Sequence, residues 1–308
     1  MKDLIVRPKK LDDFIGKDQL KKTLKIYINS SKLRNVALDH IIFYGWAGVG
    51  KTTLATVIAN ELNAKIHYIQ GPSIEKISDI LDMVSMINDN DIVFIDEAHK
   101  INHRYLETLY SIMEDFVVDV KIGKELNSQF SRLSLPKFTL ICSTTNIGNL
   151  PSSFIDRFRI KFYLDLYTDS EIEAILNNFN TVNNLSISTS DLKKIAMVSR
   201  GVPRVAINYL NSYHDYLICD QFVSVEKFFS EIGVFNSGLT DIDINYLKIL
   251  FKNKSNHIGI KTICQELFID GKTIENNIEP YLLKLSLIFK NNHGRKITSQ
   301  GIKYLNSL

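Results

Sequence analysis

The hydrophobic pattern of the first half of the chain alternates between short apolar runs and longer stretches with helical spacing. Runs with the length of strands lie at residues 41–44, 65–69, 92–96, 139–143 and 160–164. Strands that alternate with helices are typical of a parallel sheet with helices on both faces. Residues 1–167 therefore predict a doubly wound α/β domain.

A different pattern interrupts this alternation before the strand at 139. Between Val117 and Leu135, apolar and polar residues alternate on either side of Gly123. Alternation with a period of two, broken by a glycine, is typical of two paired strands. We therefore expect a β-hairpin inserted over residues 117–135.

The remainder of the chain has helical spacing and ends with another hairpin. Residues 168–238 show helical spacing only and predict a small helical lid domain. Residues 239–308 predict a third domain, with helices over 242–251, 260–268 and 273–285 and then a hairpin over 289–297 with Gly294 at its tip. That order is typical of a winged helix-turn-helix domain, which binds DNA in many proteins.

The segment between the first strand and the following helix fits a phosphate-binding loop. Residues 45–52 read Gly-Trp-Ala-Gly-Val-Gly-Lys-Thr and match G-x-x-x-x-G-K-[ST]. Such a loop aims backbone N–H groups at phosphate oxygens, and glycines such as Gly48 and Gly50 let the backbone approach closely. Lys51 is then placed to reach the β- and γ-phosphates, and the Thr52 hydroxyl to bind Mg²⁺. The motif predicts a nucleoside triphosphate and Mg²⁺ as ligands.

Polar residues follow two of the predicted strands where they end. Asp96 closes the strand at 92–96 beside the loop, where it can hold the Mg²⁺ shell, and Glu97 is placed to deprotonate an attacking water. The strand at 139 ends in Ser-Thr-Thr-Asn, and a polar residue at its tip can sense the γ-phosphate. Thr145 and Asn146 are both candidates for that role.

Two arginines extend the candidate site. Arg157, just before the last strand, can project into the nucleotide of a neighbouring subunit as an arginine finger, and the alternative is a surface ion pair with Asp156. Arg204 ends the string Gly-Val-Pro-Arg at 201–204, where it can contact the γ-phosphate and couple the lid to the nucleotide. The alternative for that string is a helix cap.

Composition narrows the class of protein. The 308 residues are 45% hydrophobic and 23% charged, as in an ordinary soluble globular protein, and no apolar stretch has the length of a membrane span. The charged start of the chain does not fit a signal peptide. Cys142, Cys219 and Cys264 are widely spaced and predict reduced thiols in a cytoplasmic protein.

Positive charge is concentrated in the last predicted domain. The whole chain has a net charge of +3, whereas residues 241–308 carry 10 Lys and Arg against 6 Asp and Glu. A basic C-terminal module favours contact with nucleic acid, and a solvated surface is the alternative.

Several longer strings resemble the RuvB family of AAA+ motors, which drive branch migration of Holliday junctions. They lie at residues 7–16, 113–116, 137–141, 200–204 and 278–282. The Glu-Asp-Phe string at 114–116 and the Glu-Pro-Tyr-Leu string at 279–282 are more specific than the phosphate loop. The resemblance runs from about residue 6 to the C-terminus, and it implies an ATP-driven DNA motor with an AAA+ fold.

The resemblance also implies roles for individual residues. The positions that match ATP contacts are Val6, Arg7, Gly48, Lys51, Thr52, Thr53, Glu114, Asp115, Phe116, Tyr167 and Arg204. Arg157 takes the position of the finger, and Lys290 and Arg295 take positions that contact the DNA backbone. The hairpin over 117–135 matches the one that binds the family's junction-binding partner, RuvA. The implied assembly is a homohexameric ring on duplex DNA at four-way junctions, which works with RuvA and a junction-resolving nuclease in recombination and repair.

Some positions depart from the family pattern. Ile155 replaces an arginine, Asn146 stands where the family usually has one, and the wing at 291–293 is less basic than usual. Residues 96–99 read Asp-Glu-Ala-His, which is a motif of a different helicase superfamily. That superfamily needs two RecA-like domains, for which a chain of this length with a helical lid has no room.

Two other functions compete with the motor. A clamp-loader-like switch would use ATP to open a protein ring, but such proteins typically end in a helical collar and not in a winged helix. A DNA-binding regulator with a degenerate ATPase is disfavoured by the intact Lys51, Asp96 and Glu97.

Overall fold

The structure, a computed structural model, describes residues 7–122, 129–220, 222–254 and 256–308. The chain divides into two units. The first is Met1–Ile175 together with Val202–Arg204, and the second is Leu176–Gly201 with Val205–Leu308. This division is coarser than the three domains expected from the sequence, whose boundaries stay predictions.

The first unit is built on a five-stranded parallel sheet. In spatial order its strands are β2 (Ile66–Gln70), β3 (Ile92–Asp96), β6 (Thr139–Thr144), β1 (Ile41–Gly45) and β7 (Ile160–Leu164). All five predicted strands are confirmed, with ends that differ by no more than one residue. Because the strands are parallel, their carboxyl ends meet at one edge of the sheet. Strand β6 lies between β1 and β3, so its tip separates the two strands that carry the predicted site.

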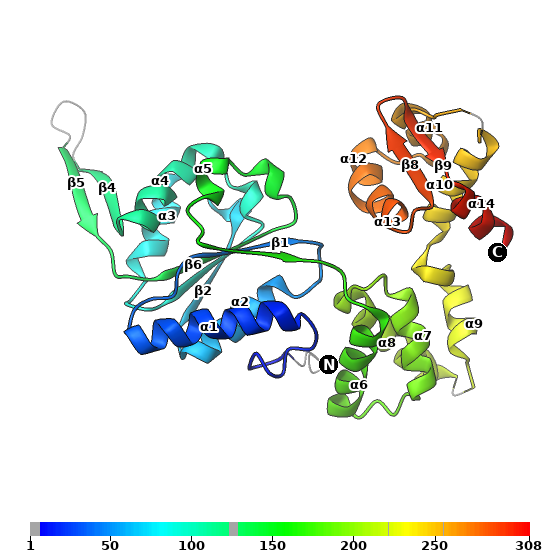
Figure 1. Cartoon of the computed structure of the whole chain (residues 1–308), viewed down its shortest axis with the longest axis horizontal. Coiled ribbons are helices and arrows are strands. Elements are labelled where there is room, and N and C mark those ends of the chain that lie inside the picture. The colour runs from blue at the N-terminus through cyan, green and yellow to red at the C-terminus, as the bar shows by residue number, and fades with distance from the viewer. Residues whose placement is uncertain (1–6, 123–128, 221, 255) are drawn as a thin grey trace. The chain divides into compact units, whose positions relative to one another are not determined.

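Helices cover both faces of this sheet, as the pattern predicts (Figure 1). Helices α1 (Asp18–Arg34) and α2 (Lys51–Leu62) lie on one face, and α3 (Ile77–Ser85), α4 (His103–Glu114) and α5 (Ser152–Ile155) lie on the other. A hydrophobic core cluster lies under α3, α4 and α5, where Ile42, Val93 and Leu140 of the sheet pack against buried helix residues such as Leu109. Short 3-10 turns η1 (Gly71–Ser73), η2 (Ala98–Lys100) and η4 (Ile147–Asn149) connect these elements.

The predicted hairpin before β6 is present. Strands β4 (Val117–Ile122) and β5 (Gln129–Ser134) pair antiparallel, with Val117 opposite Ser134 and Ile122 opposite Gln129. Gly123 and the rest of the connection to residue 128 lie outside the described residues.

The second unit is helical and ends with the predicted winged helix. Its helices before residue 239 are α6 (Asp169–Asn183), which begins in the first unit, α7 (Thr189–Val198), α8 (Pro203–Cys219) and α9 (Val225–Glu231). A 3-10 turn η5 (Asn236–Gly238) leads to α10 (Asp241–Lys252), α11 (Ile260–Leu267), α12 (Gly271–Thr273), the π-turn η6 (Ile274–Ile278), α13 (Glu279–Lys284), β8 (Ile288–Asn291), β9 (Gly294–Ile297) and α14 (Ser299–Asn306).

The helix expected over 273–285 is confirmed, and it contains a π-turn. A π-turn over Ile274–Ile278 separates α12 from α13, and Pro280 occupies the first turn of α13. Proline has no N–H group and crowds the carbonyl four residues earlier, so it is tolerated where a helix begins and not within one. The π-turn is therefore where the helix accommodates Pro280, and the hydrophobic pattern did not predict it.

Gly294 does not lie at the tip of the wing. Asn292 and His293 form the turn, and Gly294 is the first residue of β9, with a φ of 132°. A Cβ atom there would lie 2.5 Å from the carbonyl oxygen of Ile258, which pairs with Arg295 in an isolated bridge. The glycine is thus required by a close backbone approach beneath the wing.

His40 connects the start of the sheet to the end of α4 through hydrogen bonds of its ring. Its Nδ1 accepts a hydrogen bond of 2.9 Å from the N–H of Leu140, so Nε2 carries the proton and donates to the carbonyl of Met113 at 3.0 Å. The ring is buried, and burial holds the pKa of His40 below its ordinary value, against smaller opposing effects of the Met113 carbonyl and Asp39.

We predict that His40 makes the first unit sensitive to acid. The unfolded chain takes up a proton near the ordinary histidine pKa of about 6.5 whereas the folded chain resists it, so stability falls as pH drops below that value. His40→Gln should lower the free energy of unfolding at neutral pH by about 1–3 kcal/mol, because a buried partner is lost. It should also weaken the acid dependence of thermal unfolding.

His103→Gln is the matched control, because His103 is exposed in the first turn of α4. An equal acid dependence of unfolding in wild type and His40→Gln would show that His40 does not carry this effect.

Candidate active site

The glycines of the phosphate loop have backbone conformations that other residues rarely adopt. Gly45, Gly48 and Gly50 have φ values of 131°, 75° and 96°. A Cβ atom on Gly48 would lie 2.8 Å from a methyl group of Val202 and 3.1 Å from Cβ of Arg204. The loop therefore needs glycine both for its left-handed turns and for the close approach of residues 202–204.

Residues from distant parts of the sequence surround this loop. The N–H of Arg204 donates to the carbonyl of Gly48 at 3.4 Å, and the Tyr167 hydroxyl donates to the carbonyl of Val49 at 3.2 Å. Lys17 lies over the ring of Tyr167, 4.2 Å from its centre. The structure thus brings the predicted nucleotide contacts Tyr167 and Arg204 to the loop, and their roles toward ATP stay predictions.

Lys51 is the most strongly perturbed cation of the site. Its Nζ donates to the carbonyls of Gly45 at 2.9 Å and Trp46 at 2.7 Å, and the residue is 8% exposed. Burial lowers the pKa of Lys51 to about 8, while Asp96 acts in the opposite direction and Arg204 in the same one. A lysine that is costly to keep charged gains stability when an anion reaches it.

The Asp96 carboxylate joins three elements at the carboxyl edge of the sheet. One oxygen accepts from the Thr52 hydroxyl of α2 at 3.3 Å. The other accepts from the Ser143 hydroxyl of β6 and from the N–H of Glu97 at 3.0 Å. A hydroxyl and a carboxylate are the hard oxygen donors that Mg²⁺ prefers, so Thr52 and Asp96 fit the predicted metal site. Thr53 follows half-buried on α2.

Glu97 is turned away from the strand that precedes it. Its φ of 52° is left-handed, and its carboxylate, 41% exposed, accepts a hydrogen bond of 2.6 Å from Lys100. Gly71 packs behind it so closely that a Cβ atom there would lie 2.5 Å from the Glu97 carbonyl. The turn presents the Glu97 side chain to the open side of the site, where an acid can take a proton from water.

The tip of β6 is connected to the turn after β3. The Thr144 hydroxyl lies 2.9 Å from Nδ1 of His99 and also accepts from the N–H of Asn146 at 3.0 Å. The neighbouring candidates Thr145 and Asn146 have exposed side chains, and their role as a sensor stays a prediction. Ser143, Thr144 and His99 escaped the sequence reasoning. The Asp-Glu-Ala-His string is the one signal that could have drawn attention to His99.

The remaining predicted contacts near the N-terminus are described only in part. Arg7 is exposed, and Val6 lies outside the described residues. The segment that follows runs along α2, because the N–H of Leu11 donates to Glu61 at 3.0 Å and Asn60 donates to the carbonyl of Lys9 at 3.1 Å.

A second group of predicted contacts lies at the opposite edge of the sheet. Glu114 ends α4, and Arg157 precedes β7. The Nε of Arg157 lies 3.3 Å from a carboxylate oxygen of Glu114, and its guanidinium lies 4.1 Å from the ring centre of Tyr110. Arg157 therefore pairs with Glu114 and not with Asp156, which pairs instead with Lys161.

Asp115 and Phe116 belong to the same end of α4. The Phe116 ring lies 6.0 Å from the ring of His40 and 5.8 Å from that of Phe138, both at the amino edge of the sheet. Asp115 caps the helix with an exposed side chain. Residues 114–116 are thus held together, but away from the phosphate loop of their own chain.

The two groups cannot meet within one copy of the chain. The phosphate loop follows the carboxyl end of β1, whereas Glu114 and Arg157 lie beside its amino end. Five residues of strand span about 16 Å, and the sheet fills the space between. The two groups of predicted contacts therefore lie apart within one copy of the chain.

The residues expected to contact DNA form ion pairs in the wing. Lys290 and Arg295 lie opposite each other on β8 and β9. Both contact Glu275 and Glu279, and Arg295 is only 7% exposed. No sequence pattern predicted this network, and contact with DNA stays a prediction for both cations.

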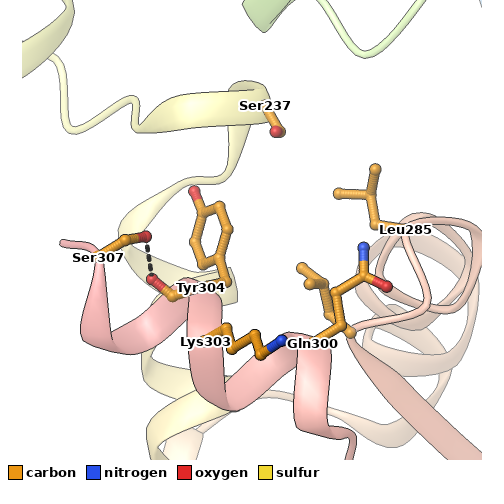
Figure 2. Close-up of a pocket in the computed structure, with 7 residues that line it drawn as sticks. Ser237, Leu285, Gln300, Lys303, Tyr304 and Ser307 are labelled. Atoms are coloured by element: carbon orange, nitrogen blue, oxygen red, sulfur yellow. Dashed lines mark hydrogen bonds between the residues drawn. The ribbon is translucent and has the colours of Figure 1, made fainter.

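A hollow of about 390 Å³ lies beside α14 in the second unit (Figure 2). Its lining residues are Ser237, Leu285, Leu287, Gln300, Lys303, Tyr304 and Ser307. These seven include no carboxylate and no histidine. In the described ranges, no helix has both the length and the apolar character that crossing a membrane requires.

Two family models match the chain. The model for the Holliday junction DNA helicase RuvB P-loop domain matches residues 6–164, and the model for the RuvB C-terminal winged helix domain matches residues 236–306. The matches include both the phosphate loop and the wing.

Relatives are similar over nearly their whole length. The Holliday junction branch migration complex subunit RuvB of Ureaplasma urealyticum is 44% identical over 300 residues, which cover 97% of this chain and 96% of that protein. The corresponding subunit of Mycoplasmopsis pulmonis is 40% identical over 308 residues, which cover 97% of each.

Solved structures agree with these matches. The Thermotoga maritima RuvB Holliday junction branch migration motor has a TM-score of 0.84 at 32% identity, over 97% of this chain and 98% of that one. The Aeropyrum pernix ORC2 protein, with a TM-score of 0.56 at 14% identity, shares the fold alone.

We predict that the low pKa of Lys51 links nucleotide binding to pH. Phosphate oxygens favour the charged lysine, so binding raises the pKa of Lys51 above about 8 and takes up a proton near that pH. Affinity for MgATP should then fall by up to about tenfold per pH unit as pH rises above 8. Calorimetry in buffers of different ionisation enthalpy measures this proton uptake.

Lys51→Arg is the control, because a guanidinium stays charged over this range and should leave any remaining binding free of proton uptake. Proton uptake of the same size in Lys51→Arg, or none in wild type, would contradict the assignment.

Proposed function

The chain belongs to the RuvB family, and from this premise we propose that it is an ATP-hydrolysing motor that drives branch migration of Holliday junctions. The observation that carries the mechanism is the separation of the candidate site into two halves at opposite edges of one sheet. A motor whose copies form a ring would complete each site with residues of the next copy. Neither half would then act alone.

Within one copy, the half-site at the carboxyl edge binds the nucleotide. Lys51 and the loop N–H groups hold the phosphates, and Glu97 takes the proton from the attacking water. Thr52 and Asp96 would hold Mg²⁺, which would supply positive charge at the phosphates. The bond between Lys100 and Glu97 keeps the base oriented until water is present.

The other half-site acts on the nucleotide of the neighbouring copy. Arg157 leaves Glu114 and places its guanidinium beside the γ-phosphate, where charge develops during transfer. Glu114, Asp115 and Phe116 contribute further contacts from the end of α4. The Arg157 side chain is 22% exposed and also donates to the carbonyl of Ser153, so an incoming phosphate would have to replace both partners.

Arg204 would couple the bound nucleotide to the rest of the chain. This residue lies in the first turn of α8, whose N-terminus touches the phosphate loop and whose remainder belongs to the second unit. A change at the γ-phosphate that shifts Arg204 therefore moves a helix that both units share.

The proposed partners follow from the same family. The motor works on duplex DNA at four-way junctions, as a homohexameric ring, in the cytoplasm. The hairpin over 117–135 binds RuvA, and Leu133 on β5, 48% exposed, offers it an apolar side chain. A junction-resolving nuclease acts after the motor, in recombination and repair. The winged helix holds the DNA through Lys290 and Arg295.

We predict complementation between two inactive variants. Glu97→Gln keeps the phosphate contacts but loses the base, and Arg157→Ala keeps a complete loop but loses the finger, so each alone should hydrolyse ATP very slowly. In mixed rings, an interface can combine the Glu97 of one variant with the Arg157 of the other. Steady-state ATPase of the mixture should therefore exceed that of either variant alone.

Arg159→Ala is the matched control, because this exposed arginine lies two residues away and pairs with Asp39. It should keep wild-type ATPase. Absence of complementation in rings shown by native mass spectrometry to be mixed would contradict a finger that acts between copies.

A further inference from the structure

The wing carries an exposed carboxylate that holds both of its predicted DNA contacts. A single oxygen of Glu275 accepts from Nζ of Lys290 at 3.0 Å and from Nη2 of Arg295 at 2.6 Å. The Glu275 side chain is 45% exposed, Lys290 is 34% exposed and Arg295 is 8% exposed. Glu275 therefore lies at the surface, on the side from which a ligand would reach the two cations.

A second acid in the same network is structural. Glu279 is 1% exposed and accepts from Nε of Arg295 at 2.7 Å, from Nζ of Lys290 at 2.7 Å and from the Tyr246 hydroxyl at 3.1 Å. Glu275 and Glu279 are four residues apart on the helical segment before the wing, so both face the hairpin. Glu279 is buried and hydrogen-bonded, so it stabilises the wing. Glu275 is much more exposed.

Two cations and two carboxylates leave this part of the wing with no net charge. The hydrogen bonds from Lys290 and Arg295 hold the pKa of Glu275 below its ordinary value, so it stays ionised at neutral pH. A DNA phosphate that approaches Lys290 or Arg295 meets a group that already occupies the same donors.

We propose that Glu275 competes with DNA phosphates for Lys290 and Arg295 and so limits how tightly the wing holds duplex DNA. This inference rests on the proposed contact of these two cations with DNA. Binding exchanges the exposed carboxylate for a phosphate while Glu279 stays in place, so the cations are positioned before DNA arrives. A motor must release each phosphate as it advances. Release is easier when Lys290 and Arg295 regain a carboxylate partner as the phosphate leaves.

The test is the salt dependence of DNA binding by the full chain. Fluorescence anisotropy of a labelled linear duplex of mixed sequence, with Mg²⁺ and a non-hydrolysable ATP analogue, gives affinity at each salt concentration. Glu275→Gln keeps the shape of the side chain and removes its charge. It should bind several-fold more tightly at low salt, with a slope of log affinity against log salt that is steeper by about 0.9.

Matched variants separate competition from general repulsion. Glu266→Gln removes another exposed acid of the same module, from α11, and should change affinity and slope much less. Glu275→Asp keeps the charge but withdraws it by one methylene, and it should bind with intermediate affinity. In Lys290→Ala, the further change Glu275→Gln should give a smaller gain than in wild type, because only Arg295 remains to be freed.

The experiment distinguishes failure of the proposed DNA contact from failure of the proposed competition by Glu275. If Lys290→Ala binds duplex as tightly as wild type, the proposed DNA contact of the wing is wrong. If Lys290→Ala weakens binding but Glu275→Gln does not strengthen it, or if Glu266→Gln gives an equal gain, competition by Glu275 is overturned. Unchanged basal ATPase and thermal unfolding in Glu275→Gln and Glu275→Asp verify that both variants fold.

Discussion

The parallel order of the central sheet is the constraint on which the site depends. All five strands end at one edge, so the phosphate loop, Asp96 and the tip of β6 meet there. Helix α4 runs back across the sheet, and His40 fastens its end beside the start of β1. Glu114 and Arg157 are thereby held at the other edge. In the motor that we propose, this places the nucleotide site on one side of the chain and the arginine finger on the other, so that hydrolysis would depend on the assembly.

Several side chains with a proposed role already have a polar partner in the structure. Lys51 donates hydrogen bonds to carbonyls of the phosphate loop, and Glu97 accepts one from Lys100. Arg157 forms an ion pair with Glu114, and Lys290 forms ion pairs with two glutamates. Each pair satisfies a charge at moderate cost and leaves it directed toward its proposed target. In the wing, the same arrangement underlies our proposal that Glu275 limits how strongly DNA is held.

Local features of the site were predictable from the sequence, and contacts between distant segments were not. The motif at 45–52 and the acids after β3 carry their own signal, because chemistry fixes both residue type and spacing. The bond from Thr144 to His99, the ion pair of Arg157 with Glu114 and the burial of Arg295 depend on which elements become neighbours. The π-turn before Pro280 is an intermediate case, since the proline was visible but its effect on the helix was overlooked.

Branch migration of a synthetic four-way junction, followed with a fluorescent strand in the presence and absence of RuvA, is the most direct test of the proposed motor. With ATP, Mg²⁺ and RuvA, the chain should convert the junction to its duplex products, and withholding ATP or replacing Glu97 by Gln should prevent it. RuvA should lower the concentration of the chain that is needed. Conversion at equal rates with and without ATP, or none under any of these conditions, would contradict an ATP-driven motor of Holliday junctions.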